Sequence, residues 1–123
     1  MSFDNKDITL LASAARTAET ESDEQTNTRG KGLHVIIDVT VDPATASITP
    51  KIQGKDPASG KWYDILVGIA ITATGMTVLK VYPGIVAVAN AAASDILPAH
   101  WRFQMAVADT DSMTYSVGAL VIN

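Results

Sequence analysis

The chain has 123 residues and a mass of 12.9 kDa, enough for one domain with its own hydrophobic core. It carries 13 acidic and 9 basic residues, for a net charge of -4, and the basic residues are scattered, so nucleic-acid binding is not expected. The absence of cysteine excludes disulfides, thiolate metal sites and a cysteine nucleophile.

The N-terminal residues combine a short apolar run, residues 8–15, with acidic neighbours. Asp4 and Asp7 outnumber Lys6, whereas a secretory signal peptide begins with a basic region, so no signal peptide is expected. No run approaches the ~20 apolar residues of a transmembrane helix, and no membrane association is expected. The run is interpreted as a first β-strand.

Residues 17–32 form a charged stretch that contains no large apolar side chain. Such a segment buries too little surface to order itself. It is interpreted either as a solvated loop after the first strand or as an arm that lets this strand pack on a neighbouring subunit. The chain therefore divides into an N-terminal strand with a polar arm or linker, residues 1–31, and a β-sandwich domain, residues 32–123.

Apolar residues then alternate with polar ones, which is the pattern of half-buried strands. The predicted inward positions are Leu33, Val35, Ile37, Val39 and Val41; Ile48 and Ile52; Thr77, Leu79 and Val81; Trp101, Phe103, Met105 and Val107; and Met113, Tyr115, Val117, Ala119 and Val121. Pro50 interrupts the run 47–53, and because proline cannot donate to a β-ladder, this run is predicted to be an edge strand or to contain a bulge.

Turn residues separate these runs. Residues 54–60, with two glycines and a proline, are typical of a hairpin loop between the runs 47–53 and 61–67. The alanine-rich residues 85–93 fit either a helical turn or an irregular crossover. Short strands with turns about every 8–12 residues predict an all-β fold. We expect an antiparallel β-sandwich or barrel, jelly-roll or immunoglobulin-like, with an N-terminal arm.

The chemistry-bearing residues do not form a recognisable catalytic or metal motif. Asp109 and Asp111 could offer oxygen ligands to calcium, but the further ligands of a calcium loop are missing and a simple turn explains both residues. His34 and His100 fall on the polar sides of strands, and no nucleophile-elbow pattern is present. We therefore expect no enzyme activity, no cofactor and no metal.

Two aromatic residues, Trp62 and Tyr63, directly follow the predicted hairpin loop. Neighbouring side chains of a strand point to opposite faces, so one ring must point away from the core. Such a ring suits a protein interface better than a sugar-stacking platform. Together with Ile8 and Leu10 of the first strand, these two residues are the candidate interaction residues.

Five segments carry a family resemblance: GLHVIIDVT (32–40), IQGKDPASGKWYDI (52–65), VLKVYPG (78–84), DILPAHWR (95–102) and DSMTYSVG (111–118). In this order they resemble a family of small structural proteins encoded by tailed bacteriophages. The resemblance covers the chain from about residue 30 to its C-terminal end, and the first 29 residues have no counterpart. It implies a virion component, assembled in the host cytoplasm, whose partner is the major capsid protein or another virion protein.

Within this family the expected function is that of a capsid decoration, or cement, protein that binds the head lattice. The alternative is a neck, tail or fibre-associated β-sandwich module that recognises a receptor or a carbohydrate. Only 18% of the residues are charged, which is few for a well-solvated monomer, so we expect a homo-oligomer with a trimer as its form.

Overall fold

The computed structural model describes residues 6–41, 47–108 and 112–123, and in these residues it contains ten strands and no helix. The strands are β1 (Lys6–Arg16), β2 (Thr20–Glu21), β3 (Gln25–Thr26), β4 (Gly32–Val41), β5 (Ile48–Lys55), β6 (Trp62–Val67), β7 (Gly75–Val81), β8 (Ala92–Ala93), β9 (His100–Val107) and β10 (Met113–Ile122). The predicted all-β fold is confirmed.

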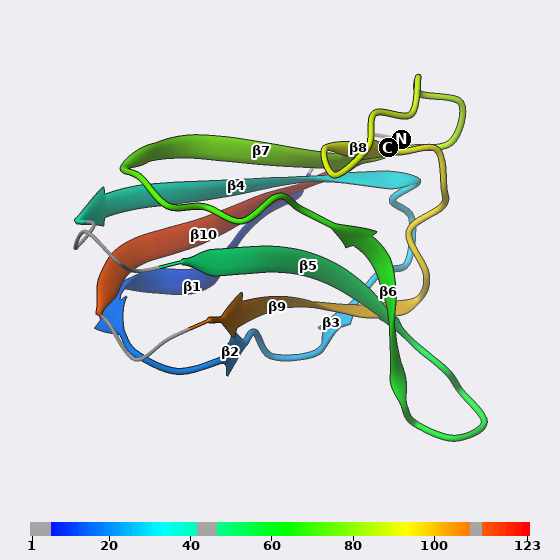
Figure 1. The fold of residues 1–123 in the computed structure, drawn as a ribbon. Helices are drawn as coiled ribbons and strands as arrows, with labels where there is room; N and C mark the ends of the chain where they lie inside the picture. Colours follow the sequence, from blue (N-terminus) through cyan, green and yellow to red (C-terminus); the bar gives the residue numbers. More distant parts are fainter. Residues whose placement is uncertain (1–5, 42–46, 109–111) are drawn as a thin grey trace.

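Two sheets pack against each other in a sandwich-like arrangement (Figure 1). Sheet A has the order β1-β10-β4-β7-β8, and sheet B has the order β2-β9-β5-β6, with β3 also paired to β9. Pairing is antiparallel throughout the long strands, as predicted, and only the two-residue β8 runs parallel to its neighbour β7.

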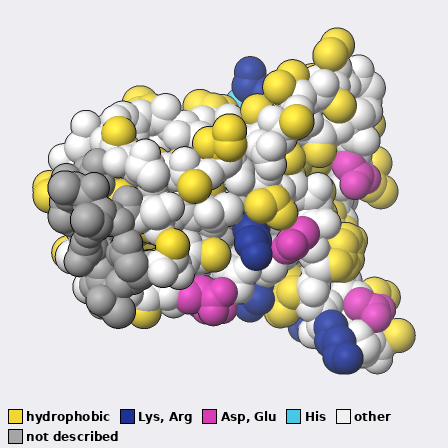
Figure 2. Space-filling model, in the orientation of Figure 1, with side chains coloured by type: hydrophobic (Ala, Val, Ile, Leu, Met, Phe, Trp, Pro, Cys, Tyr) yellow, Lys and Arg dark blue, Asp and Glu magenta, His cyan; other side chains and the backbone are white. Residues whose placement is uncertain are grey.

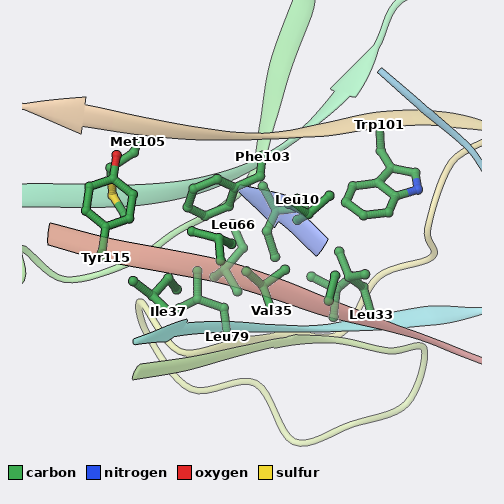
Figure 3. Packing of buried hydrophobic residues seen from close by; sticks show 14 of the residues in the cluster. Leu10, Leu33, Val35, Ile37, Leu66, Leu79, Trp101, Phe103, Met105 and Tyr115 are labelled. Carbon is green, nitrogen blue, oxygen red and sulfur yellow. The ribbon is translucent and has the colours of Figure 1, made fainter. Parts of the chain in front are cut away.

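The core lies between the sheets and is made by the predicted stripes. Trp101, Phe103 and Met105 of β9 face the apolar side chains of β4 across the interior (Figure 3). The inward residues of β4 and β10 from Leu33 to Val39 and from Met113 to Val121 are buried. Val41 differs from the prediction, since it is 58% exposed. A register shift between Thr114 and Tyr115 ends the regular pairing just before it.

Pro50 lies in a central strand, so of the two predicted alternatives for the run 47–53 the edge position is wrong; the pairing with β6 does contain a register shift, between Ile52 and Gln53. β5 pairs with β9 on one side and β6 on the other. The carbonyl of Pro50 accepts a hydrogen bond from the N–H of Gly68, 2.7 Å away, just beyond the end of β6. In an antiparallel strand the nitrogen of a residue faces the same side as its carbonyl. The missing donor therefore faces the irregular residues after β6, and the ladder with β9 is uninterrupted.

The N-terminal segment contributes to both sheets of its own chain. β1 pairs with β10 from Lys6 to Arg16, and Leu10 is buried in the core. Residues 17–32, expected to lack structure, contain β2 and β3 on the edge of β9. Between them the side chain of Ser22 accepts from the N–H of Phe103 at 2.9 Å. The backbone edge of β9 orders this segment, which its own composition does not reveal. Pairing of the first strand with a neighbouring subunit stays a prediction.

The alanine-rich residues 85–93 adopt the irregular of the two predicted forms. The link between β7 and β8, residues 82–91, projects from one end of the molecule (Figure 1). Asn90 there has a positive φ of 61°, a conformation that asparagine tolerates better than most residues. The link then returns to the sheet as β8.

Candidate interaction surfaces

The four predicted interaction residues lie in two different environments. Ile8 packs against the core and Leu10 is only 8% exposed, so in this chain both serve the interior. Trp62 and Tyr63 begin β6 at the hairpin. Tyr63 is 50% exposed, and its ring lies against Gly54 on the opposite strand. Trp62 is partly covered by charged side chains on the outer face of sheet B.

Cationic groups lie over the ring of Trp62. The guanidinium of Arg102 is 4.5 Å from the ring centroid, and the Nζ of Lys55 is 5.6 Å from it. Contacts of this kind contribute roughly 0.5–1 kcal/mol at exposed positions. Arg102 is also fixed by a hydrogen bond on the same face of the sheet, because its Nε donates to the Oε1 of Gln53 at 2.8 Å. The ring and the guanidinium therefore have a fixed mutual orientation.

Gln53 is the centre of this arrangement and is only 7% exposed. Its Nε2 donates to Asp64 Oδ1 at 2.9 Å and to Gln104 Oε1 at 3.1 Å. A buried amide needs such partners, because a buried polar group without a hydrogen bond is destabilising. We call the outer surface of sheet B formed by Gln53, Lys55, Trp62, Asp64, Arg102 and Gln104 the Trp62 face.

Glu24, which lies between β2 and β3, connects this part of the chain to the Trp62 face by ion pairs. One carboxylate oxygen lies 2.7 Å from Lys55 Nζ and the other 3.1 Å from His100 Nδ1. The hydrogen bond from Lys55 is the main cause that lowers the pKa of Glu24. His100 is exposed, as its predicted position on the polar side of the strand requires. The Trp62 face thus joins residues from four parts of the chain.

The hairpin loop between β5 and β6 is closed by its own polar groups, which supports the predicted hairpin. Ser59 Oγ donates to Asp56 Oδ2 at 2.7 Å, and the N–H of Ala58 donates to Asp56 Oδ1 at 2.9 Å. These bonds, that of Ser59 foremost, lower the pKa of Asp56. Gly60 supplies the positive φ of 75° that returns the chain to β6. The loop projects beyond the sheets (Figure 1).

A second group of exposed side chains comes from a part of the sequence with little charge. Between Asp64 and Asp95 the sequence contains a single charged residue, Lys80. Several apolar side chains of this segment are nevertheless open to solvent: Ile69 (68% exposed), Met76 (69%), Val78 (39%), Val86 (82%) and Val88 (53%). Figure 2 shows hydrophobic side chains gathered over the projecting link between β7 and β8. We call these five residues the neutral side; on the outer face of sheet A, Asp38 of β4 lies opposite Met76, and Lys80 follows Val78 on β7.

Sequence reasoning missed most of both surfaces. The charge gap that marks the neutral side is visible in the sequence from residue 65 to residue 94. The Trp62 face has no comparable signal, because it depends on the register that sets Gln53 opposite Arg102 and Asp64.

The other residues considered for chemistry remain separate. Among the described residues, no three His, Asp or Glu side chains are grouped so that they could hold a metal ion. Asp109 and Asp111, considered as calcium ligands, lie outside the described residues. The described part of the chain also has no helix with the length and apolar character needed to cross a membrane.

Comparisons of the chain with protein-family models, with curated proteins and with solved structures found no match. Its function is therefore argued from the surfaces described above and from the resemblance of its sequence segments.

Proposed function

We propose that the chain is a structural protein of a tailed-bacteriophage virion and acts as a capsid decoration protein on the head lattice. The neutral side is the observation that carries this proposal. Exposed apolar side chains that gather on one surface are typical of a protein interaction site, and Val86 is 82% exposed. The five phage-like segments of the sequence add support. A jelly-roll or immunoglobulin-like relationship belongs to the same proposal.

The link of residues 82–91 is the part of the neutral side best suited to insert into a partner. Its ends are held by hydrogen bonds from Lys80 N to Ala91 O at 2.9 Å and from Tyr82 N to Ala93 O at 3.1 Å. Near the C-terminal end of the link, Asn90 Nδ2 donates to Val67 O at 2.9 Å and connects the link to the end of β6. A link that is already held loses little conformational entropy on binding. Val86 and Val88 would therefore be presented to a recess of the major capsid protein at low entropic cost.

The N-terminal arm can take part in the assembly without new contacts. If β1 were exchanged between copies, it would make with the neighbour's β10 the pairing that it makes here within one chain. Exchange of an identical element is a low-cost route to oligomers. The proposal includes this exchange as one way in which copies on the head could be linked.

The first experiment asks whether the chain is part of the particle. Virions produced from the genome that encodes the chain are purified and their proteins identified by mass spectrometry. A cryo-EM map then locates the β-domain, which we expect on the outer surface of the head. Absence of the chain from purified particles would contradict a virion role, and density at the neck or fibres would contradict decoration.

The second experiment tests the surface. Val86→Asp with Val88→Asp places two charges on the link, and Ala58→Asp places one on the exposed hairpin loop as a control. Particles that lack the protein are mixed with each variant and sedimented. We expect the link variant to stay in the supernatant and the control to sediment with the particles, with unchanged melting temperatures. Wild-type binding by the link variant would exclude the link as the contact.

The Trp62 face supports a second candidate, a neck, tail or fibre-associated module that recognises a carbohydrate. An aromatic ring beside fixed amide and charged groups is a common way to bind a sugar, and Arg102 and Gln53 provide those groups here. Oligosaccharides of the host surface are titrated while the tryptophan fluorescence is followed. Saturable quenching that Trp62→Ala removes, while Tyr63→Ala retains it, would favour this candidate over decoration.

A further inference from the structure

One stretch of β7 has an open backbone edge. The N–H of Lys80 donates to Ala91 and that of Tyr82 to Ala93, so the even-numbered residues here direct their backbone groups away from β4. By the alternation of an antiparallel ladder, Met76 and Val78 direct theirs the same way. The pairing of β7 with β8 includes only Lys80 and Val81. In the described part of the chain, no strand lies opposite Met76 and Val78.

The long edge strands β1 and β6 have protective features that this stretch of β7 lacks. Two register shifts interrupt β1, and Arg16 donates to the carbonyl oxygens of Ala12 and Ala14. β6 carries the charged Asp64, and the side chain of Asn90 donates to its Val67 carbonyl. Bulges, charges and covering groups are the devices by which proteins prevent edge pairing.

The open stretch of β7 is instead apolar. The side chains of Met76 and Val78 are 69% and 39% exposed, and the segment from residue 65 to residue 79 has no charge. A backbone edge of this kind is suited to pair with another strand.

We propose that this strand is the β7 of a second copy of the chain, paired antiparallel across a two-fold axis at Thr77. In this register Met76 lies opposite Val78 of the second copy, and each such pair exchanges two N–H···O=C hydrogen bonds. A shift of the register by one residue pair in either direction would use Lys80, which is already bonded to the β8 segment, or Thr74, which lies in a bend before the strand. The Thr77 register therefore uses both free residues.

Charge is the reason to choose a second copy as the occupant. A two-fold contact brings the same surface patch of the two copies together, so a patch of one charge repels itself and a neutral patch does not. The Thr77 register sets Lys80 opposite the uncharged Thr74, and Asp38, the β4 partner of Met76, lies one strand away from the contact with a charge opposite to that of Lys80. Met76 and Val78 become cross-strand neighbours of the same residues in the second copy, which buries apolar surface. The contact joins two A sheets and makes a dimer, in place of the trimer expected from composition.

Cysteine cross-linking tests the axis directly, because the chain contains no cysteine. Across a two-fold axis at Thr77 the two Cα atoms form a non-hydrogen-bonded pair about 4.5 Å apart, within disulfide range. Thr77→Cys should therefore be converted to a covalent dimer by mild oxidation, whereas Ser59→Cys on the hairpin loop should remain mostly monomeric. Equal cross-linking of the two variants would overturn the proposal.

A proline variant tests the hydrogen bonds. Val78→Pro removes the outward N–H but no bond to β4, and Val78→Thr keeps the N–H as a matched control. In sedimentation equilibrium we expect at least a tenfold higher dissociation constant for the proline variant and a near wild-type value for the threonine variant. A wild-type protein that is monomeric at every concentration overturns the proposal. The proposal is also overturned if the protein is a monomer and its binding to virion proteins depends on Val78, because the strand that pairs with β7 then belongs to another protein.

Discussion

Two polar atoms in the core have no hydrogen-bond partner among the described residues, Trp101 Nε1 and Tyr115 OH. Both side chains are fully buried. Burial raises the pKa of Tyr115, while the nearby Thr20 and Arg16 act in the opposite direction. Arg16 lies over the ring, 4.6 Å from its centroid. Both residues were predicted as core from alternation, but the environment of a hydroxyl or indole group depends on side chains from distant parts of the chain.

Removal of the Tyr115 hydroxyl should cost little or no stability, because the polar groups near it, Thr20 and Arg16, make no hydrogen bond of good geometry to it. In Tyr115→Phe the ring and its packing stay, and a buried polar group without a partner is lost. We expect the free energy of unfolding to be unchanged or higher by up to about 1 kcal/mol. Urea unfolding followed by tryptophan fluorescence measures it. A loss of more than about 1 kcal/mol would show that the hydroxyl has a partner such as a buried water molecule.

Phe103 is the contrasting case, because its fully buried ring has no polar atom. Phe103→Ala leaves a cavity at the centre of the core (Figure 3). The expected loss is about 3–5 kcal/mol, a large part of the stability of a small domain. Urea unfolding or, if the variant is too unstable, the loss of near-ultraviolet circular dichroism shows it. A loss below about 1 kcal/mol would mean that the sheets close over the gap.

His34 should make the protein less stable in acid. It is partly buried, and burial, followed by the charge of Lys80, lowers its pKa from the ordinary 6.5. As the pH falls through the ordinary value, the unfolded chain takes up a proton before the folded chain does, so the free energy of unfolding decreases. We expect His34→Gln to reduce the fall in melting temperature between about pH 7 and pH 5. An unchanged pH profile would assign the acid sensitivity to other groups.

At the scale of strands, the sequence predicted what depends on alternation and failed where pairing decides. The inward stripes of β4, β9 and β10 follow directly from their period of two residues. The central position of Pro50 cannot be predicted in this way, because it depends on the residue at which the pairing between β5 and β6 ends. Gln53 lies on the outer face of β5, yet it is only 7% exposed because Asp64, Arg102 and Gln104 cover it. Residue spacing within one strand contains no information on such neighbours.

Two glycines in sheet A provide a matched test of backbone crowding. A Cβ on Gly32 would lie 2.3 Å from the backbone oxygen of Val81, whereas on Gly118 its nearest neighbour would be Ile8 O at 3.8 Å. Gly32→Ala must therefore separate β4 from the end of β7 and should lower the free energy of unfolding by about 1–3 kcal/mol. Gly118→Ala should be neutral or stabilising by about 0.4–1 kcal/mol, because it restricts the unfolded chain. Equal effects in urea unfolding would contradict this difference.

At the scale of the whole molecule, composition predicted one small domain, and the segment resemblance remains the source of the virion hypothesis. The neutral side could have been found from the charge gap between Asp64 and Asp95. The division of the chain at residue 31 rested on the polar composition of residues 17–32, which omits the hydrogen bonds that β9 offers to this segment. The structure therefore changes what truncation is expected to do.

Removal of residues 1–31 should destabilise the remaining domain. From the sequence, the domain of residues 32–123 would fold alone, but β1 supplies Leu10 to the core and covers β10, and β2 and β3 cover β9. We expect the truncated chain to lose the dispersed amide signals of a folded β-protein in NMR spectra. A cooperative unfolding transition with the wild-type midpoint would show that β1 is dispensable and therefore free to act as an exchanged arm.

The pairing of β1 with β10 also has a consequence for biosynthesis. The first strand leaves the ribosome well before the residues that pair with it, because Met113–Ile122 is made roughly 100 residues later. At about 5–20 residues per second, β1 waits some seconds without its native partner. Sheet A can therefore be completed only after β10 has been made, and the nascent chain is most exposed to misassembly with other nascent chains during that interval.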